Sequence, residues 1–259
     1  MNKYIIDTDG NTEALQAIES ILKEQKEKII AITIVSSFLS LKTAANNVLM
    51  MLERNNYNIP VYLGAENPLS QPPKKLSLAS HTSSLKKANK TVEEVFAANK
   101  IITEATDNDL EIIAMGPLTN IALAIIKNRE KMKNIKALNI LGGMLFHGDI
   151  APLSEYNFYM DAQAADCVFK FSVPIKLFPI DMGNYSERIK YVFNPDLIEK
   201  QYLSYTRIET QGDITYGANI NDARDISQTE TTAKNTVLRE KNCIIVAENT
   251  TEIINKEVE

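Results

Sequence analysis

The sequence predicts an α/β fold: a single domain with a mostly parallel central sheet flanked by helices. Short apolar runs rich in β-branched residues alternate along the chain with amphipathic stretches of helical spacing. Strands separated by helices form crossovers, which place the strands parallel and cover the sheet with helices. The chain has 259 residues, of which 44% are hydrophobic, so it is long enough for one large core.

Each element is predicted from its own pattern. Ala14, Ile18 and Leu22 recur at helical spacing behind Thr12, which is the predicted cap, and residues 29–35 form a continuous apolar run typical of a strand buried on both faces. Predicted strands cover 4–6, 29–35, 59–63, 111–115, 138–141, 175–180 and 243–247. Predicted helices cover 12–24, 41–52, 92–103, 118–126, 162–171 and a short final segment, whereas 69–90 is a predicted surface loop. Beyond Asp181 the pattern is less regular, and no linker divides residues 1–259.

Composition excludes several classes of protein. The formal net charge of −5 argues against nucleic acid or an anionic membrane as a partner. Cys167 and Cys243 lack CxxC spacing, so we expect buried fillers rather than a disulfide or a zinc site. The first residues have no signal-peptide layout and no apolar run reaches membrane length, which predicts a cytoplasmic protein.

An acidic cluster follows the first predicted strand. Asp7 and Asp9 are two residues apart, so in extended backbone they point to the same face, and Glu13 falls in the first turn of the next helix. Carboxylates crowded in this way bind a hard cation, share a proton or bind sugar hydroxyls. Acidic residues also favour turns and helix N-termini, so the cluster alone leaves both interpretations open. Neither a GxGxxG motif nor a P-loop is present.

Three co-linear motifs carry a family resemblance. Residues 7–14 read DTDGNTEA, residues 116–120 read GPLTN, and residues 155–161 read EYNFYMD after the pair Gly142-Gly143. They resemble, in order, the Asp-x-Asp-x-x-x-Asp-Asp, Gly-Pro-Leu-Thr-Asn and Glu-x-Asn-x-x-x-Asp segments of the nucleoside hydrolase family, whose members include inosine-uridine preferring nucleoside N-ribohydrolases. The resemblance covers nearly the whole chain.

The resemblance implies a reaction and a set of site residues. Family members cleave the N-glycosidic bond of a ribonucleoside with a water that calcium activates. By resemblance, Asp9 would be a calcium ligand and the general base, with Asp7 and the Thr119 carbonyl as further metal ligands. The implied substrate-binding residues are Glu13, Asp149, Glu155, Asn157 and, in the base-side loop, His81. A small ribonucleoside or ribose-like ligand is the implied partner, and a homo-oligomer is expected by analogy.

The chain departs from the family pattern at three places. Ala14 replaces the second aspartate of the first motif, and Phe38 replaces an asparagine and is expected to fill part of the pocket. The late His-Asp pair is missing, and we predict that the helical segment carrying it is deleted between about 186 and 194. Calcium takes about six to eight oxygen ligands, so we expect Ca²⁺ to bind weakly or not at all unless Glu13, Asp149 or Asp181 supplies an oxygen.

Three functions follow from these observations. The first is a divergent ribonucleoside N-glycosidase with a degenerate metal site and weak or lost activity. The second is an inactive relative that binds a ribose-containing ligand or acts as a partner subunit. The third is a haloacid-dehalogenase-like phosphatase, suggested by Asp7-Thr8-Asp9-Gly10, with Asp7 as nucleophile and Asp9 as acid/base. The Gly-Pro-Leu-Thr-Asn and Glu-x-Asn blocks argue against the third.

Overall fold

The computed structural model describes residues 2–72, 86–198, 200–211, 215–225 and 243–247. The strands are β1 (Lys3–Thr8), β2 (Ile29–Ile34), β3 (Val61–Leu63), β4 (Leu110–Met115), β5 (Ala137–Leu141), β6 (Ile175–Phe178), β7 (Lys200–Ile208), β8 (Asn219–Asp225) and β9 (Cys243–Ala247). The helices are α1 (Thr12–Gln25), α2 (Leu41–Arg54), α3 (Ala97–Glu104), α4 (Thr119–Lys127), α5 (Arg129–Met132), α6 (Tyr156–Met160), α7 (Ala162–Phe169) and α8 (Tyr185–Phe193). Short 3₁₀ turns lie at Lys26–Lys28, Ile180–Met182 and Pro195–Leu197.

The described strands form one nine-stranded sheet in the order β3-β2-β1-β4-β5-β6-β9-β7-β8. All pairs from β3 to β9 are parallel, whereas β7 pairs antiparallel with both β9 and β8. The predicted α/β fold with a mostly parallel sheet is therefore confirmed. In such a sheet the loops after the carboxyl ends of the strands form the ligand-binding edge.

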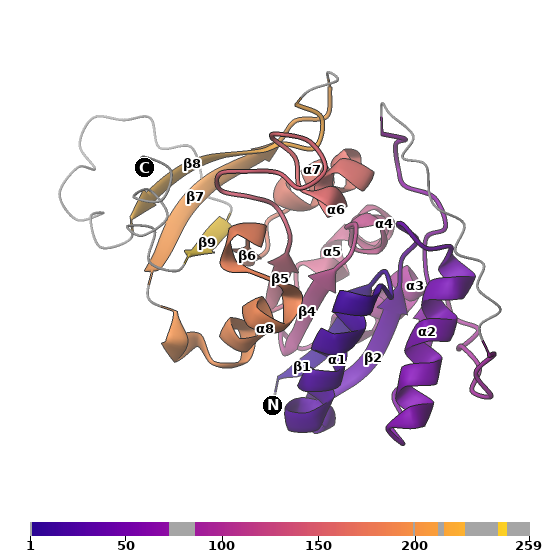
Figure 1. Cartoon of the computed structure of the whole chain (residues 1–259). Coiled ribbons are helices and arrows are strands. Elements are labelled where there is room, and N and C mark those ends of the chain that lie inside the picture. The colour runs from indigo at the N-terminus through magenta and orange to yellow at the C-terminus, as the bar shows by residue number, and fades with distance from the viewer. Residues whose placement is uncertain (1, 73–85, 199, 212–214, 226–242, 248–259) are drawn as a thin grey trace, which may run out of the picture.

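Helices cover both faces of the sheet and bury two apolar layers (Figure 1). Ile5 points into the layer formed with α3, α4 and α7, and its neighbour Ile6 points into the layer formed with α1, α2 and α8. Successive residues of a strand face opposite sides, so β1 contributes to both layers at once. β1 is thereby fixed in register between β2 and β4, and its last residues reach the ligand-binding edge.

Several elements differ from their predicted bounds. The helix predicted from residue 92 begins at Ala97, because Glu93 instead forms a parallel bridge with Tyr62. Asn11, not Thr12, caps α1, and its side-chain oxygen accepts a hydrogen bond from Ala14 N at 2.8 Å. The predicted strand at 175–180 ends at Phe178.

The region after Asp181 is more regular than the sequence predicted. It contains α8, which starts with a reciprocal capping box between Asn184 and Glu187, and the antiparallel pair β7–β8. The predicted final helix lies outside the described residues, as does most of the predicted loop at 69–90. Among the helices that the structure describes, none is long and apolar enough to cross a membrane.

Gly10 fixes the turn between β1 and α1 and gives a test of the fold. Its φ is +64°, and a Cβ at this position would lie 2.6 Å from the carbonyl oxygen of Ala44. We expect Gly10→Ala to lower the free energy of unfolding by ~1–3 kcal/mol. Alanine is strained at this positive φ, and its Cβ would also overlap the backbone of Ala44. Thr12→Ala, an exposed change two residues away, is the control and is expected to stay within about 0.5 kcal/mol in urea denaturation. Equal stability of the two variants would contradict the tight turn.

Candidate functional site

Asp7 lies fully buried near the end of β1. Its Oδ1 accepts hydrogen bonds from Thr33 Oγ1 at 2.5 Å and from Asn120 Nδ2 at 2.8 Å, whereas its Oδ2 is buried without a hydrogen-bond partner in the described chain. Burial raises the pKa of Asp7 to about 7, although the bonds from Asn120 and Thr33 oppose the shift. One carboxylate oxygen is thus fixed by the fold and the other is free.

Asp9 follows β1 directly, at the ligand-binding edge. It is almost fully buried, and its Oδ1 accepts a hydrogen bond from Asn11 N at 3.2 Å. Burial raises the pKa of Asp9 to about 6, and hydrogen bonds from Asn11 and Ser37 act in the opposite direction. The negative charge of Asp9 in turn raises the pKa of Asp7, so the two carboxylates lie close enough to repel each other, as their spacing predicted.

Asn120 joins three strands at this edge. Its Nδ2 donates to Asp7 and to the Ile34 carbonyl at 3.1 Å, and its Oδ1 accepts from Ala65 N at 2.8 Å. A Cβ at Gly64 would lie 2.1 Å from that Oδ1, so only glycine allows this approach. Asn120 belongs to the second motif, but its role was not predictable from the sequence. Its hydrogen-bond partners lie far away along the chain, on or next to other strands.

Thr119 connects the second motif to the third. Its hydroxyl donates to Asp161 Oδ2 at 2.6 Å, and Asp161 also accepts from Leu69 N at 2.8 Å and from Ala164 N at 3.0 Å. Thr119 is the first residue of α4, and Leu118 occupies the cap position. The side chain of Thr119 is therefore committed to Asp161, and only its carbonyl is a candidate for the predicted metal role.

Glu155 and Asn157 form a buried polar pair at the start of α6. Glu155 caps the helix: its Oε2 accepts from Gly143 N at 3.0 Å and from Phe158 N at 3.2 Å, and its Oε1 accepts from Asn157 N at 3.0 Å. Burial raises the pKa of Glu155 to about 7. Asn157 Nδ2 donates to the Tyr185 hydroxyl at 2.8 Å, and its Oδ1 is buried without a partner among the described residues.

Tyr185 is the point at which the two halves of the site meet. Burial raises the pKa of its hydroxyl well above the ordinary value, and the negative charges of Asp9 and Glu155 raise it further. The charges of Asp9 on the β1 side and Glu155 on the α6 side therefore both act on this hydroxyl. No signal in the sequence pointed to Tyr185, because the helical segment at α8 was expected to be deleted and no inward-facing side chain was expected there.

Comparison with known proteins now identifies the family. The family model described as inosine-uridine preferring nucleoside hydrolase matches residues 4–205. The chain belongs to this family. An uncharacterized protein of Schizosaccharomyces pombe is 31% identical over 191 residues, which are 70% of this chain and 61% of that protein. The non-specific ribonucleoside hydrolase RihC of Salmonella typhimurium is 27% identical over 203 residues, which are 76% of this chain and 65% of that protein.

Solved structures agree with the fold. An inosine-guanosine nucleoside hydrolase structure superposes with a TM-score of 0.81 at 20% identity and covers 99% of this chain and 97% of the other. This chain spans less than two thirds of the length of the curated nucleoside hydrolase relatives named above.

Glu13 and Asp149, which the resemblance implied as substrate-binding residues, both accept hydrogen bonds from backbone N–H groups. Glu13 Oε1 accepts from Tyr185 N at 2.6 Å, so this carboxylate holds the first turn of α8. Asp149 is exposed, and its Oδ1 accepts from Tyr156 N at 2.7 Å. Although the residue is exposed, partial desolvation of its carboxyl raises the pKa of Asp149, with hydrogen bonds from the backbone opposing the shift. Both residues hold helix N-termini, and His81 lies outside the described residues.

The oxygens around β1 do not fit a tight calcium site. No group of three or more His, Cys, Asp or Glu residues suited to a metal ion occurs in the part of the chain that the structure describes. Both oxygens of Asp181 are held by the backbone: its Oδ2 accepts from Leu145 N at 2.6 Å and its Oδ1 accepts from Phe146 N at 3.1 Å. Phe38, which was expected to fill part of the pocket, is 37% exposed. Asp7 Oδ2, Asp9 and the Thr119 carbonyl are the remaining candidate ligands, fewer than calcium requires.

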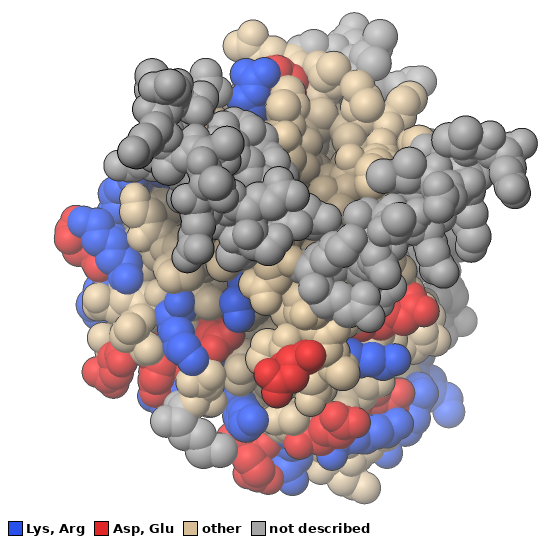
Figure 2. Space-filling model, turned by 90° about the vertical axis from the view of Figure 1, so that its left-hand side faces the viewer, with Lys and Arg blue, Asp and Glu red and all other residues tan. Residues whose placement is uncertain are grey.

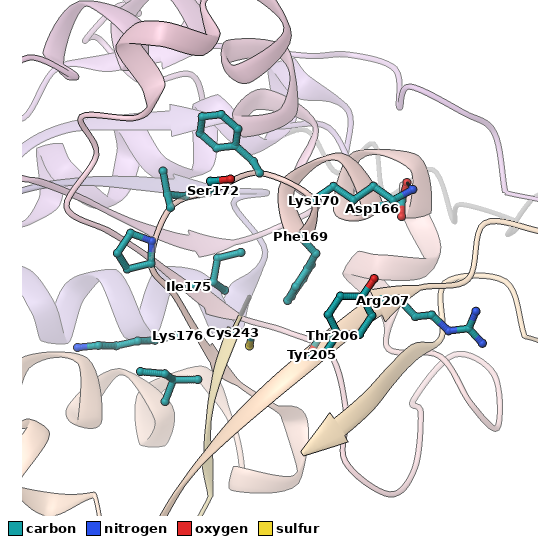
Figure 3. A pocket seen from close by; sticks show the side chains of 14 residues that line it. Asp166, Phe169, Lys170, Ser172, Ile175, Lys176, Tyr205, Thr206, Arg207 and Cys243 are labelled. Carbon is teal, nitrogen blue, oxygen red and sulfur yellow. Dashed lines mark hydrogen bonds and ion pairs between the residues drawn. The ribbon is translucent and has the colours of Figure 1, made fainter. Parts of the chain in front are cut away.

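A cavity of about 620 Å³ lies away from these residues, and Figure 3 shows its lining side chains. Ser172 and Ile175 place it at the amino end of β6, and Cys243 places it at the amino end of β9. Lys176 and Arg207 extend from it in different directions, so their charges do not converge on one point (Figure 3). The cavity contains none of the predicted site residues, and we assign it no role.

The raised pKa of Glu155 predicts a pH dependence of stability. In the folded chain the Glu155 carboxyl stays protonated up to about pH 7, whereas in the unfolded chain it ionises near its ordinary pKa of 4.5. Between these two pKa values the folded state therefore binds more protons than the unfolded state. The contribution to stability is therefore present at low pH and is lost as the pH rises through about 7. We expect Glu155→Gln to be destabilised most at pH 5. The difference in free energy of unfolding between this variant and the unaltered chain should shrink as the pH rises, by roughly 1.4 kcal/mol per pH unit, until the pH reaches the folded-state pKa of about 7. Urea denaturation at several pH values measures the gap, and a constant gap would contradict the shift.

Proposed function

We propose that this protein binds ribonucleosides through the ribose and hydrolyses their N-glycosidic bond slowly, without a tightly bound calcium ion. The observation that carries the proposal is the Tyr185 hydroxyl, which is bonded to Asn157 and influenced by the charges of both Asp9 and Glu155. A carboxylate suited to proton transfer and a polar pair suited to sugar hydroxyls thus share one place in the fold. Family membership supports the reaction class.

The ribose would bind on the α6 side. The free Oδ1 of Asn157 can accept a hydrogen bond from a sugar hydroxyl, and leaving this buried oxygen unbonded is unfavourable when no ligand is present. Glu155 is held by three backbone N–H groups, so its carboxyl has little freedom to move when a ligand arrives. Such a preformed polar pair favours one orientation of the sugar.

Asp9 would act as the general base. With a pKa of about 6 it is mostly ionised at pH 7, and it can accept a proton from a water that attacks the anomeric carbon. The bond between that carbon and the base nitrogen breaks, and its electron pair leaves with the base, which must take up a proton. The products are free ribose and free base. We place no acid for the leaving base among the described residues, and this gap supports slow turnover.

A second candidate is a relative that binds ribonucleosides without cleaving them. It is favoured by the first motif, in which Ala14 offers no ligand atom and Glu13 is bonded to the backbone of α8. Under both candidates the partner is a small ribonucleoside. Acidic and basic side chains are intermixed over the described part of the face in Figure 2, which gives no extended basic surface there for nucleic acid. Assembly into a homo-oligomer stays a prediction, as does the deletion between about 186 and 194.

Release of free ribose from a panel of ribonucleosides tests the proposal. We expect slow release that Asp9→Ala reduces by at least ~100-fold, because a positioned general base contributes about that much. Asp166→Ala is the matched control: Asp166 is also a buried aspartate, but it pairs with Lys170 at 2.7 Å and lies in α7. We expect this control to keep its activity. Millimolar calcium should change neither the rate nor the melting temperature strongly.

The alternatives give different results. Binding of ribonucleosides without any release would favour the second candidate. Strong thermal stabilisation by calcium, lost in Asp9→Ala, would contradict the weak metal site.

A further inference from the structure

The first turn of α8 places two buried polar side chains on one face. Tyr185 and Arg188 are three residues apart, so they are neighbours on the helix surface, and their exposed fractions are 6% and 3%. The backbone around them is fixed twice: by the capping box between Asn184 and Glu187, and by the bond from Tyr185 N to Glu13 Oε1. Their position relative to the site is therefore set by both α1 and α8.

The Tyr185 hydroxyl has a proton to donate. In its contact with Asn157 the amide nitrogen is the donor and the hydroxyl oxygen the acceptor. The described residues offer no acceptor at hydrogen-bond distance for the hydroxyl proton. Burial and the charges of Asp9 and Glu155 keep the pKa of this group well above its ordinary value, so the proton stays in place at neutral pH. A buried donor without an acceptor indicates a place for a ligand oxygen.

Arg188 holds the ring of Tyr185. Its guanidinium carbon lies 4.6 Å from the ring centroid, and its Nη1 donates to the Phe178 carbonyl at 3.1 Å. Arg188 is the one buried Lys or Arg side chain in the described part of the chain, and its Nε is buried without a partner there. Its positive charge also lowers the pKa of Glu155 and of Asp149. The cation therefore stabilises both the ring and the negative charge of the ribose side.

We propose that Tyr185 is a ligand-binding residue whose hydroxyl donates a hydrogen bond to one ribose oxygen, and that Arg188 is the positioning residue that keeps its ring in place. The inference rests on the proposed function, because the ligand is the ribose of a ribonucleoside. Asn157 and Tyr185 then act as a complementary pair: the amide oxygen accepts from the sugar and the phenol donates to it.

Binding of inosine by Tyr185→Phe tests the proposal. The variant keeps the ring and its contact with Arg188 but removes the hydroxyl. We expect the Kd for inosine, measured by isothermal titration before much ribose is released, to rise roughly three- to tenfold, as for the loss of one neutral hydrogen bond. Tyr62→Phe is the matched control, because Tyr62 is also a buried tyrosine beneath a cation, with Lys100 Nζ 5.4 Å from its ring centroid. Its Kd should equal that of the unaltered chain.

Deoxy analogues show whether the hydroxyl contacts the sugar. Among 2′-, 3′- and 5′-deoxyinosine, one is expected to bind the unaltered chain and Tyr185→Phe equally, because it lacks the oxygen that Tyr185 contacts. Arg188→Met should weaken inosine binding, and this effect should vanish in the Tyr185→Phe background, since Arg188 acts through the ring. If Tyr185 has a purely structural role, Tyr185→Phe would raise the Kd for inosine and for the three deoxy analogues by the same factor. The effects of Tyr185→Phe and Arg188→Met on binding free energy would then be additive in the double variant.

The outcomes separate the two proposals. Inosine binding by the unaltered chain that is undiminished in Tyr185→Phe would overturn this inference and leave the proposed function standing. An equal loss for all three deoxy analogues would overturn it as well. If the unaltered chain binds no inosine, the proposed function fails and the inference fails with it.

Discussion

The burial of three carboxylates at the ligand-binding edge is the constraint on which the site depends. Asp7, Asp9 and Glu155 are almost fully buried, and burial raises the pKa of each to between about 6 and about 7. Buried charges are tolerated only where donors or cations compensate them. The fold provides such donors: Asn120 for Asp7 and the backbone N–H groups at the start of α6 for Glu155. These bonds fix where each carboxylate points and reduce the number of oxygens left for a metal ion.

Helix α8 changes the electrostatics of this edge. It brings a buried Arg188 and a buried Tyr185 to the acidic side chains, and the N–H of its first residue donates to Glu13 Oε1. A guanidinium carries a fixed positive charge at every relevant pH. It can therefore stabilise nearby carboxylates by its charge, as a metal ion would. Unlike a metal ion, it cannot coordinate a water and lower the pKa of that water. This distinction is the physical basis for expecting binding to persist while hydrolysis is slow.

The sequence predicted the elements with strong local patterns and missed those fixed by distant partners. The apolar run at 29–35 correctly predicted β2, and Ala14, Ile18 and Leu22 lie on the buried face of α1 as their spacing predicted. The acidic spacing placed Asp7 and Asp9 together correctly. The roles of Asn120 and Glu13 were not predictable, because their hydrogen bonds cross 113 and 172 residues of sequence. The strands β7 and β8 were missed because the sequence analysis found no regular pattern after Asp181.

The two halves of the site are built from separate parts of the fold, so one can change without the other. The β1 side depends on Asp7, Asn120 and Thr33, which join the ends of parallel strands. The α6 side depends on a helix cap, Glu155, whose partners lie within 12 residues of it. Substitution of an aspartate by Ala14 removes an oxygen from the first half but breaks no bond in the second. The charges of Asp9 and Glu155 act on the hydroxyls of both Tyr156 and Tyr185, and the Tyr185 hydroxyl is also bonded to Asn157, so Tyr185 links the α6 side to the Asp9 side.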